Sequence, residues 1–120
     1  MKKKTLVVGA STNPERYSNK AIKSLKNNAV ETIALGLRKG EVASVAIETE
    51  KLPFNNVHTV TLYLNSKRQE DYYNYIISLN PKRVIFNPGT ENTEFYKLLD
   101  ANNIETEVAC TLVLLATNQY

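Results

Sequence analysis

Cysteine and histidine are nearly absent from this sequence of 120 residues, which has one of each. With Cys110 alone, no disulfide can form within the chain, and this agrees with a reducing compartment. Metal sites usually gather several His, Cys or carboxylate ligands, and no such cluster accompanies His58. A Ser-His-Asp triad would also depend on His58, without a supporting motif. The composition therefore argues against disulfide scaffolds, metal sites and serine hydrolases.

Long hydrophobic runs are also missing, because no segment approaches the ~18 apolar residues that cross a bilayer. The start of the chain is basic, but only residues 5–10 follow before polar residues return, which is too short for a secretory signal. We therefore expect a cytoplasmic protein without a membrane partner. The net charge of +3 is mild, so it suits a small polyanionic ligand as readily as nucleic acid, and no nucleic-acid partner is expected.

What is present is an alternation of short apolar runs and amphipathic segments, without a linker or repeat, in a chain of one-domain length. Strands are predicted at residues 5–9, 31–35, 43–47, 59–64, 83–86 and 105–109, two of them (43–47 and 105–109) short. Helices are predicted at residues 18–28, 66–79, 91–101 and 111–116. This alternation predicts an α/β fold across residues 1–120: a Rossmann-like, doubly wound parallel sheet of about five strands in three α/β/α layers.

The helical segments also predict which residues face the sheet. The first helix should bury Ala21, Ile22 and Leu25, with Ser18 or Asn19 as its cap. The helix at 91–101 should turn Phe95, Leu98 and Leu99 inward, and Cys110 is interpreted as a small core residue rather than a redox thiol.

Polar, turn-forming sequence follows three predicted strands, at residues 9–18, 65–67 and 87–90. In doubly wound sheets, ligands bind outside the carboxyl ends of the strands, where the strand order reverses. The sequence therefore predicts that these three loops meet at one crevice.

The first loop has the chemistry of a phosphate site. Gly9 would let a phosphate approach the backbone, and Ser11 and Thr12 offer hydroxyl donors. The helix that begins near Ser18 presents free N–H groups and a partial positive charge, and Arg16 adds a forked cation. The alternative is a plain strand-to-helix connection with a capping serine.

The G-x-G-x-x-G fingerprint of dinucleotide-binding folds is missing. The acidic residue that would hold the ribose of NAD after the second strand is missing as well, and Arg38 follows that strand instead. An arginine there favours a ligand with an extra phosphate on its ribose, although a solvated surface arginine remains the alternative.

The stretch VVGASTNPERYSNKAIKSL resembles the opening motif of the small single-domain coenzyme A-binding proteins, relatives of the CoA-binding domain of succinyl-CoA synthetase. In that family a Gly-Ala-Ser loop is followed by Pro, a basic residue, Tyr and Ser. The segments VTLYLNSK, VIFNPGTENTEF and ACTLVLL are also similar, so the resemblance covers residues 4 to about 115. The residues that match the opening motif are Gly9, Ala10, Ser11, Pro14, Arg16, Tyr17 and Ser18.

The resemblance implies a Rossmann-like fold and a coenzyme A or acyl-CoA ligand. The pyrophosphate would then suit residues 9–18, and the 3′-phosphate of the ribose would suit a cation such as Arg38 or Lys67. Two stretches depart from the family, which usually has Pro-Val-Asn-Pro near Gly36 and a proline near Asn65. The loop at residues 87–90 is either a tight turn or a wall touching the pantetheine arm. The further candidate contacts are Gly36, Arg38, Leu64, Asn65, Lys67, Asn87, Pro88 and Gly89.

No paired general acid and base is found, so the leading hypothesis is a non-catalytic module that binds a small nucleotide ligand. One alternative is an NADP-linked oxidoreductase or another nucleotide-binding Rossmann protein, in which Arg38 would hold the 2′-phosphate. A second alternative is an interaction protein without a ligand. A protein partner or a homo-oligomer is compatible with each.

Overall fold

The computed structural model describes residues 3–120, and its framework is one seven-stranded sheet. The strand order is β3-β4-β2-β1-β5-β6-β7. Neighbouring strands are parallel except for the antiparallel pair β3–β4. The strands are β1 (Thr5–Ala10), β2 (Thr32–Gly36), β3 (Gly40–Val42), β4 (Val45–Glu48), β5 (Thr59–Leu62), β6 (Arg83–Phe86) and β7 (Glu105–Val108).

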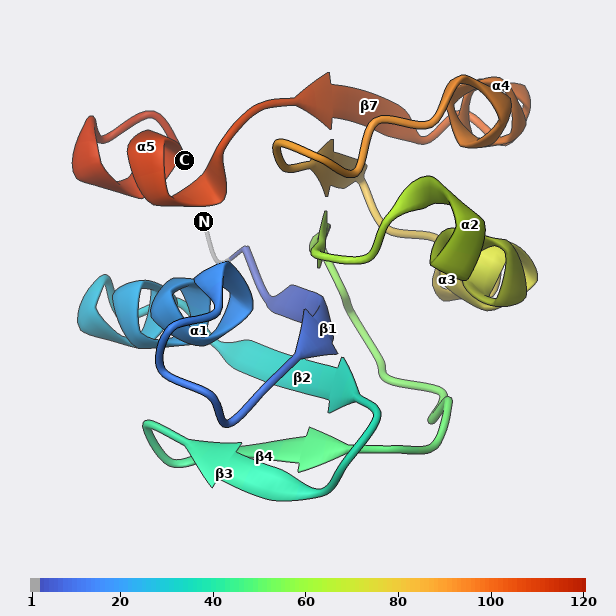
Figure 1. Ribbon diagram of the computed structural model, residues 1–120. Coiled ribbons are helices and arrows are strands. Elements are labelled where there is room, and N and C mark those ends of the chain that lie inside the picture. Colours follow the sequence, from blue (N-terminus) through green and yellow to red (C-terminus); the bar gives the residue numbers. More distant parts are fainter. Residues whose placement is uncertain (1–2) are drawn as a thin grey trace.

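Helices cover both faces of this sheet. Figure 1 shows α1 and α5 on one face and α2, α3 and α4 on the other, which gives the three α/β/α layers that the sequence predicts. The helices are α1 (Tyr17–Asn27), α2 (Ser66–Gln69), the 3-10 turn η1 (Glu70–Tyr72), α3 (Tyr73–Leu79), α4 (Thr93–Ala101) and α5 (Thr111–Ala116). None of the helices in residues 3–120 has the length and apolar character needed to cross a membrane.

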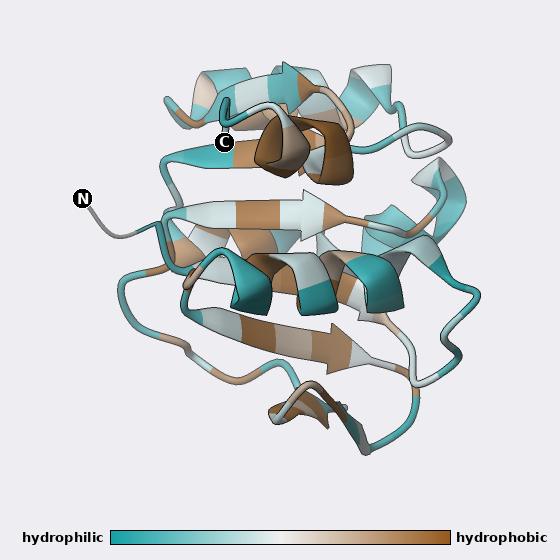
Figure 2. Ribbon diagram, turned by 90° about the vertical axis from the view of Figure 1, so that its left-hand side faces the viewer, coloured by the Kyte–Doolittle hydropathy of each residue, from teal (hydrophilic) through white to brown (hydrophobic). Residues whose placement is uncertain are grey.

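The core lies on the two faces of the central strands. Because strand side chains alternate, Leu6 and Val8 of β1 pack in the cluster with Ile76 and Leu99, while Val7 packs in the cluster with Ile22. Strands buried on both faces are continuous apolar runs, and that pattern made β1 predictable. In Figure 2 the outward face of α1 is hydrophilic and the strand behind it carries apolar segments.

The prediction of about five strands was too low. The segment predicted as one strand at 43–47 begins inside a hairpin turn, where Ala43 and Ser44 have φ values of 50° and 67°. Two consecutive positive φ values are typical of a type I′ turn, which joins β3 to β4. Such turns favour Asn-Gly, and the sequence did not indicate this turn because Ala43 and Ser44 occupy the two positions.

Two side-chain predictions on the helices were also wrong. Leu98 is 37% exposed, whereas its neighbours Phe95 and Leu99 are fully buried. Cys110 is half-buried at the N-cap position of α5 rather than in the core. The predicted helix 66–79 is divided into α2, η1 and α3.

Candidate ligand cleft at the carboxyl ends of the strands

A cleft of about 820 Å³ lies at the carboxyl ends of β1, β2, β5 and β6. From β1 the chain passes to β2 on one side, and later returns to β5 on the other side of β1. The reversal of strand order therefore falls beside β1, where the connecting helices diverge to opposite faces and leave a crevice. Residues from all three loops that the sequence predicts to meet there line this cleft.

The β1–α1 loop forms one wall and is shaped by its own hydrogen bonds. The hydroxyl of Ser11 accepts a hydrogen bond from the Asn13 N–H at 3.1 Å, and the Asn13 side chain accepts one from the Glu15 N–H at 3.0 Å. The buried Asn19 amide donates to the Ser11 carbonyl at 3.0 Å and ties the loop to α1. Because the Ser11 hydroxyl acts as an acceptor inside the loop, its hydrogen is free for a ligand.

The N-terminus of α1 has no side-chain cap. The prediction that Ser18 or Asn19 would cap the helix was wrong: Arg16 holds the N-cap position without a side-chain hydrogen bond. Ser18 and Asn19 lie in the first turn and are buried. An uncapped helix start presents free N–H groups and a partial positive charge, and Arg16, Tyr17 and Ser18 at this start line the cleft. This wall of the cleft is suited to an anion.

Two glycines allow the strand ends to approach closely. Gly9 has a φ of 93°, and a Cβ atom there would lie 3.0 Å from the backbone of Tyr63. A Cβ atom on Gly36 would lie 2.4 Å from the carbonyl oxygen of Ala10. Gly9, Ala10 and Gly36 all line the cleft, so these positions shape the backbone of its floor.

Three arginines from separate parts of the chain line the cleft. Arg16 precedes α1, Arg38 follows β2, and Arg68 lies on α2. All three are exposed, and none forms an ion pair within residues 3–120. The cleft lining contains one acidic residue, Glu15, and it includes neither His58 nor Cys110. The cleft lining therefore has excess positive charge.

The loops after β5 and β6 form the opposite wall. Asn65 caps α2 by accepting a hydrogen bond from the Arg68 N–H at 2.9 Å. Burial raises the pKa of Tyr63 to about 12, although the neighbouring hydroxyls of Thr111 and Thr61 oppose this effect, so the phenol stays neutral at physiological pH. The members of this wall are Tyr63, Leu64, Asn65, Arg68, Tyr72, Pro88, Gly89 and Thr90.

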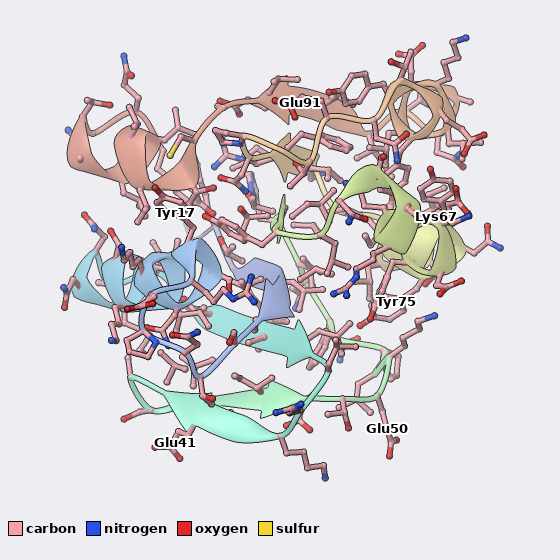
Figure 3. The ribbon with its side chains drawn as sticks, viewed as in Figure 1. Tyr17, Glu41, Glu50, Lys67, Tyr75 and Glu91 are labelled. Atoms are coloured by element: carbon pink, nitrogen blue, oxygen red, sulfur yellow. The ribbon has the colours of Figure 1, made fainter. Side chains whose placement is uncertain are left out.

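Three of the predicted site residues do not line the cleft. Pro14 is exposed, and the side chain of Lys67 is 86% exposed with its amine 3.8 Å from Glu70. Figure 3 shows Lys67 on α2 and Tyr17 by α1, on opposite sides of the sheet. Asn87 is buried, and its amide nitrogen donates to the Thr61 hydroxyl and the Leu62 carbonyl, so it holds β5 and β6 together.

The sequence predicted most of the residues that line the cleft and missed the others. The predicted residues that line the cleft are Gly9, Ala10, Ser11, Arg16, Tyr17, Ser18, Gly36, Arg38, Leu64, Asn65, Pro88 and Gly89. The lining residues that were not named as candidate contacts are Asn13, Glu15, Leu37, Tyr63, Arg68, Tyr72 and Thr90, whereas Thr12 was predicted as a hydroxyl donor of the first loop. Asn13, Glu15 and Thr90 lie inside the predicted loops at residues 9–18 and 87–90, and Leu37, Tyr63 and Arg68 each adjoin a predicted contact residue.

The strand order, the uncapped helix at the switch point and the three arginines together define a Rossmann-like domain with a positively charged cleft. The family model of the CoA binding domain matches residues 3–116. The chain belongs to this CoA-binding family.

Solved structures share the fold. The chain is 47% identical to an uncharacterized protein of known crystal structure, with a TM-score of 0.97 over 100% of this chain and 99% of that one. It is 24% identical to a hypothetical protein from Pyrococcus horikoshii OT3, with a TM-score of 0.87 over 98% and 84% of the two chains. A protein from Thermus thermophilus is 18% identical, with a TM-score of 0.86 over 99% and 91%. No curated protein matches the chain.

Proposed function

We propose that this chain binds coenzyme A or an acyl-CoA in the cleft, without catalysing a reaction, as one domain that spans residues 1–120. The observation that carries the proposal is that three arginines share one cleft with the uncapped start of α1, in a chain of the CoA-binding family. Coenzyme A carries a pyrophosphate and a ribose 3′-phosphate, so its charge complements that set.

The pyrophosphate fits the β1–α1 loop. The hydroxyl of Ser11 and the N–H groups at the start of α1 would donate to its oxygens, while Arg16 neutralises charge. The ribose 3′-phosphate fits Arg38, which follows β2 on the side where Rossmann-like folds hold the ribose. Lys67, the other cation that the sequence suggested for this phosphate, lies outside the lining.

The pantetheine arm fits the opposite wall, between the β5–α2 loop and the β6–α4 loop. This wall contributes Leu64, Pro88 and the half-buried ring of Tyr72, which are less polar than the phosphate side. A lining with a single carboxylate and neither a histidine nor a cysteine supports binding rather than catalysis.

The test is a calorimetric titration of the chain with CoA, dephospho-CoA and NADP. We expect CoA to bind most tightly, because NADP carries its extra phosphate on the 2′-oxygen and dephospho-CoA lacks one. Ser11→Ala should weaken CoA binding by roughly 10- to 100-fold, since a hydrogen bond to a charged group is worth roughly 1.5–3 kcal/mol. Tighter binding of NADP than of CoA would contradict the proposal.

Variants of two cations provide a matched control. Arg38→Ala should weaken CoA binding and remove the preference for CoA over dephospho-CoA, whereas Lys67→Ala should change neither. Both residues are exposed, so each substitution should leave the fold intact. An equal effect of the two substitutions would remove Arg38 from the ribose-phosphate site.

A further inference from the structure

Gln69 is a fully buried polar residue at the end of α2, and the cleft lining does not include it. Its amide nitrogen donates one hydrogen bond to the carbonyl oxygen of Leu64 at 2.8 Å and another to that of Thr90 at 2.7 Å. Leu64 and Thr90 both line the cleft, on two different loops. The Gln69 side chain therefore joins the loops that follow β5 and β6, from a position outside the cleft lining.

The orientation of this amide is fixed by its partners. Carbonyl oxygens only accept hydrogen bonds, so the two contacts identify the nitrogen of Gln69. The oxygen of Gln69 accepts a hydrogen bond from the Asn92 amide at 2.9 Å, and Asn92 itself caps α4 by accepting from the Phe95 N–H at 3.2 Å. Each polar atom of the Gln69 side chain thus has a partner in a buried network.

The sheet itself does not hold these loops together. The β5–β6 ladder ends at the pair Leu62–Phe86, before either loop reaches the cleft. Beyond that pair, the bonds that converge on Gln69 connect residue 64 to residue 90. Their loss would leave two buried carbonyl groups without a donor and would remove the direct link between residues 64 and 90, so that only the Asn87 bonds to Thr61 and Leu62 would still connect the bases of the two loops among the residues described.

We infer that Gln69 is a positioning residue of the ligand cleft, which sets the spacing of the two loops before the ligand arrives. The inference rests on the proposed function, because it assigns the wall that Gln69 holds to the pantetheine arm. Preorganised walls spare the ligand the free-energy cost of ordering them. Gln69 acts through Leu64 and Thr90 and does not itself touch the ligand.

The test compares two ligands and three variants. Adenosine 3′,5′-bisphosphate shares the ribose phosphate of CoA and lacks the pantetheine arm. Gln69→Glu replaces the donor with a carboxylate of nearly the same shape, and we expect it to weaken CoA binding ~10-fold or more while leaving the bisphosphate nearly unchanged. Asn92→Asp keeps the helix cap but removes the donor to Gln69, so it should weaken CoA binding in the same selective way, to a smaller degree.

Leu99→Ala is the control for a general loss of stability, because Leu99 is fully buried on α4 in the core. It should lower the melting temperature without making CoA weaker relative to the bisphosphate. A second readout uses pH, with affinities expressed relative to the parent chain at each pH. Acidification protonates the carboxyl introduced by Gln69→Glu, which can then donate to one carbonyl, so the relative CoA affinity should partly recover.

The outcomes separate the two proposals. A parent chain that binds no CoA contradicts the proposed function itself. A parent chain that binds CoA, with Gln69→Glu weakening both ligands equally or neither, contradicts the Gln69 inference alone. If Gln69→Glu does not fold, Asn92→Asp decides on the same criterion.

Discussion

Gly9 meets two separate demands at the end of β1. Its φ of 93° lies in the region that favours glycine, and a Cβ atom would approach the Tyr63 backbone to 3.0 Å. Gly89 has nearly the same φ, 91°, but a Cβ atom there would meet nothing within 4 Å. Substitutions at Gly89 therefore report on backbone strain alone, whereas those at Gly9 report on strain and steric contact together.

We expect Gly9→Ala to lower the free energy of unfolding by more than Gly89→Ala does. The positive φ should cost each variant roughly 1–3 kcal/mol, and the contact with Tyr63 adds to the loss at Gly9 alone. Urea denaturation without ligand measures both variants. Equal losses would show that the Tyr63 backbone yields to a methyl group, and Gly9 substitutions would then become clean tests of ligand binding.

We expect His58 to make the stability of the chain depend on pH. Burial, followed by the charges of Arg83, Lys3 and Lys82, lowers the pKa of His58 below its usual 6.5, and Glu105 opposes them. The unfolded chain therefore binds more protons than the folded chain between the two pKa values, so stability falls as pH drops below 6.5.

His58→Gln should flatten this dependence. The chain has one histidine, and carboxylates titrate mainly below about pH 5, so the window between about pH 5 and 6.5 reports on His58. Chemical denaturation of both chains at several pH values in this window is the measurement. An unchanged slope in the variant would assign the dependence to another group.

Among the elements, the β3–β4 hairpin carries strain at its turn. Ala43 and Ser44 are exposed, and both have positive φ, which costs residues with a Cβ atom roughly 1–2 kcal/mol each. Replacing the pair by Asn-Gly, the preferred type I′ sequence, should raise the free energy of unfolding by about 1 kcal/mol. Thermal or urea denaturation checks this, and a destabilised variant would refute the assignment of the turn.

At the scale of the whole molecule, positive charge is concentrated where the strands end. The net charge is only +3, yet three arginines from separate parts of the chain line one cleft, and none of them forms an ion pair within residues 3–120. The β1–α1 loop, the β2 end and α2 reach the same place because parallel strands share one carboxyl edge. Charge that is spread along the sequence is thereby gathered in space.

This concentration predicts a salt-dependent affinity for CoA. Raising the ionic strength from about 0.01 M to about 1 M shortens the screening length from ~30 Å to ~3 Å, so the CoA affinity should fall steadily. Titrations of Arg38→Ala should show a shallower salt dependence than those of Lys67→Ala, whose substituted charge lies outside the cleft. Parallel salt curves for the two variants would indicate that Arg38 does not interact with the ligand charge.

Local patterns of the sequence were sufficient to predict the framework and the position of the β1–α1 loop in the cleft. The apolar run of β1 ends at Gly9, and the alternation of strands with helices leaves few topologies. Parallel strands align their carboxyl ends, so the meeting of the three loops also followed from the sequence. These features depend on neighbours in the chain, which the sequence displays directly.

Only the tertiary structure decided the features that depend on distant partners. Arg68 lay inside a segment predicted as one continuous helix, and the structure places it in the first turn of α2, in the cleft lining. Gln69 is an ordinary polar helix residue in the sequence, yet its partners, Leu64 and Thr90, lie 5 and 21 residues away. Asn87, a candidate ligand contact in the sequence, is buried and donates a hydrogen bond to the Leu62 carbonyl of β5. A polar side chain has the same local sequence pattern in either role, and only the packing around it determines whether its hydrogen bonds serve the fold or face a ligand.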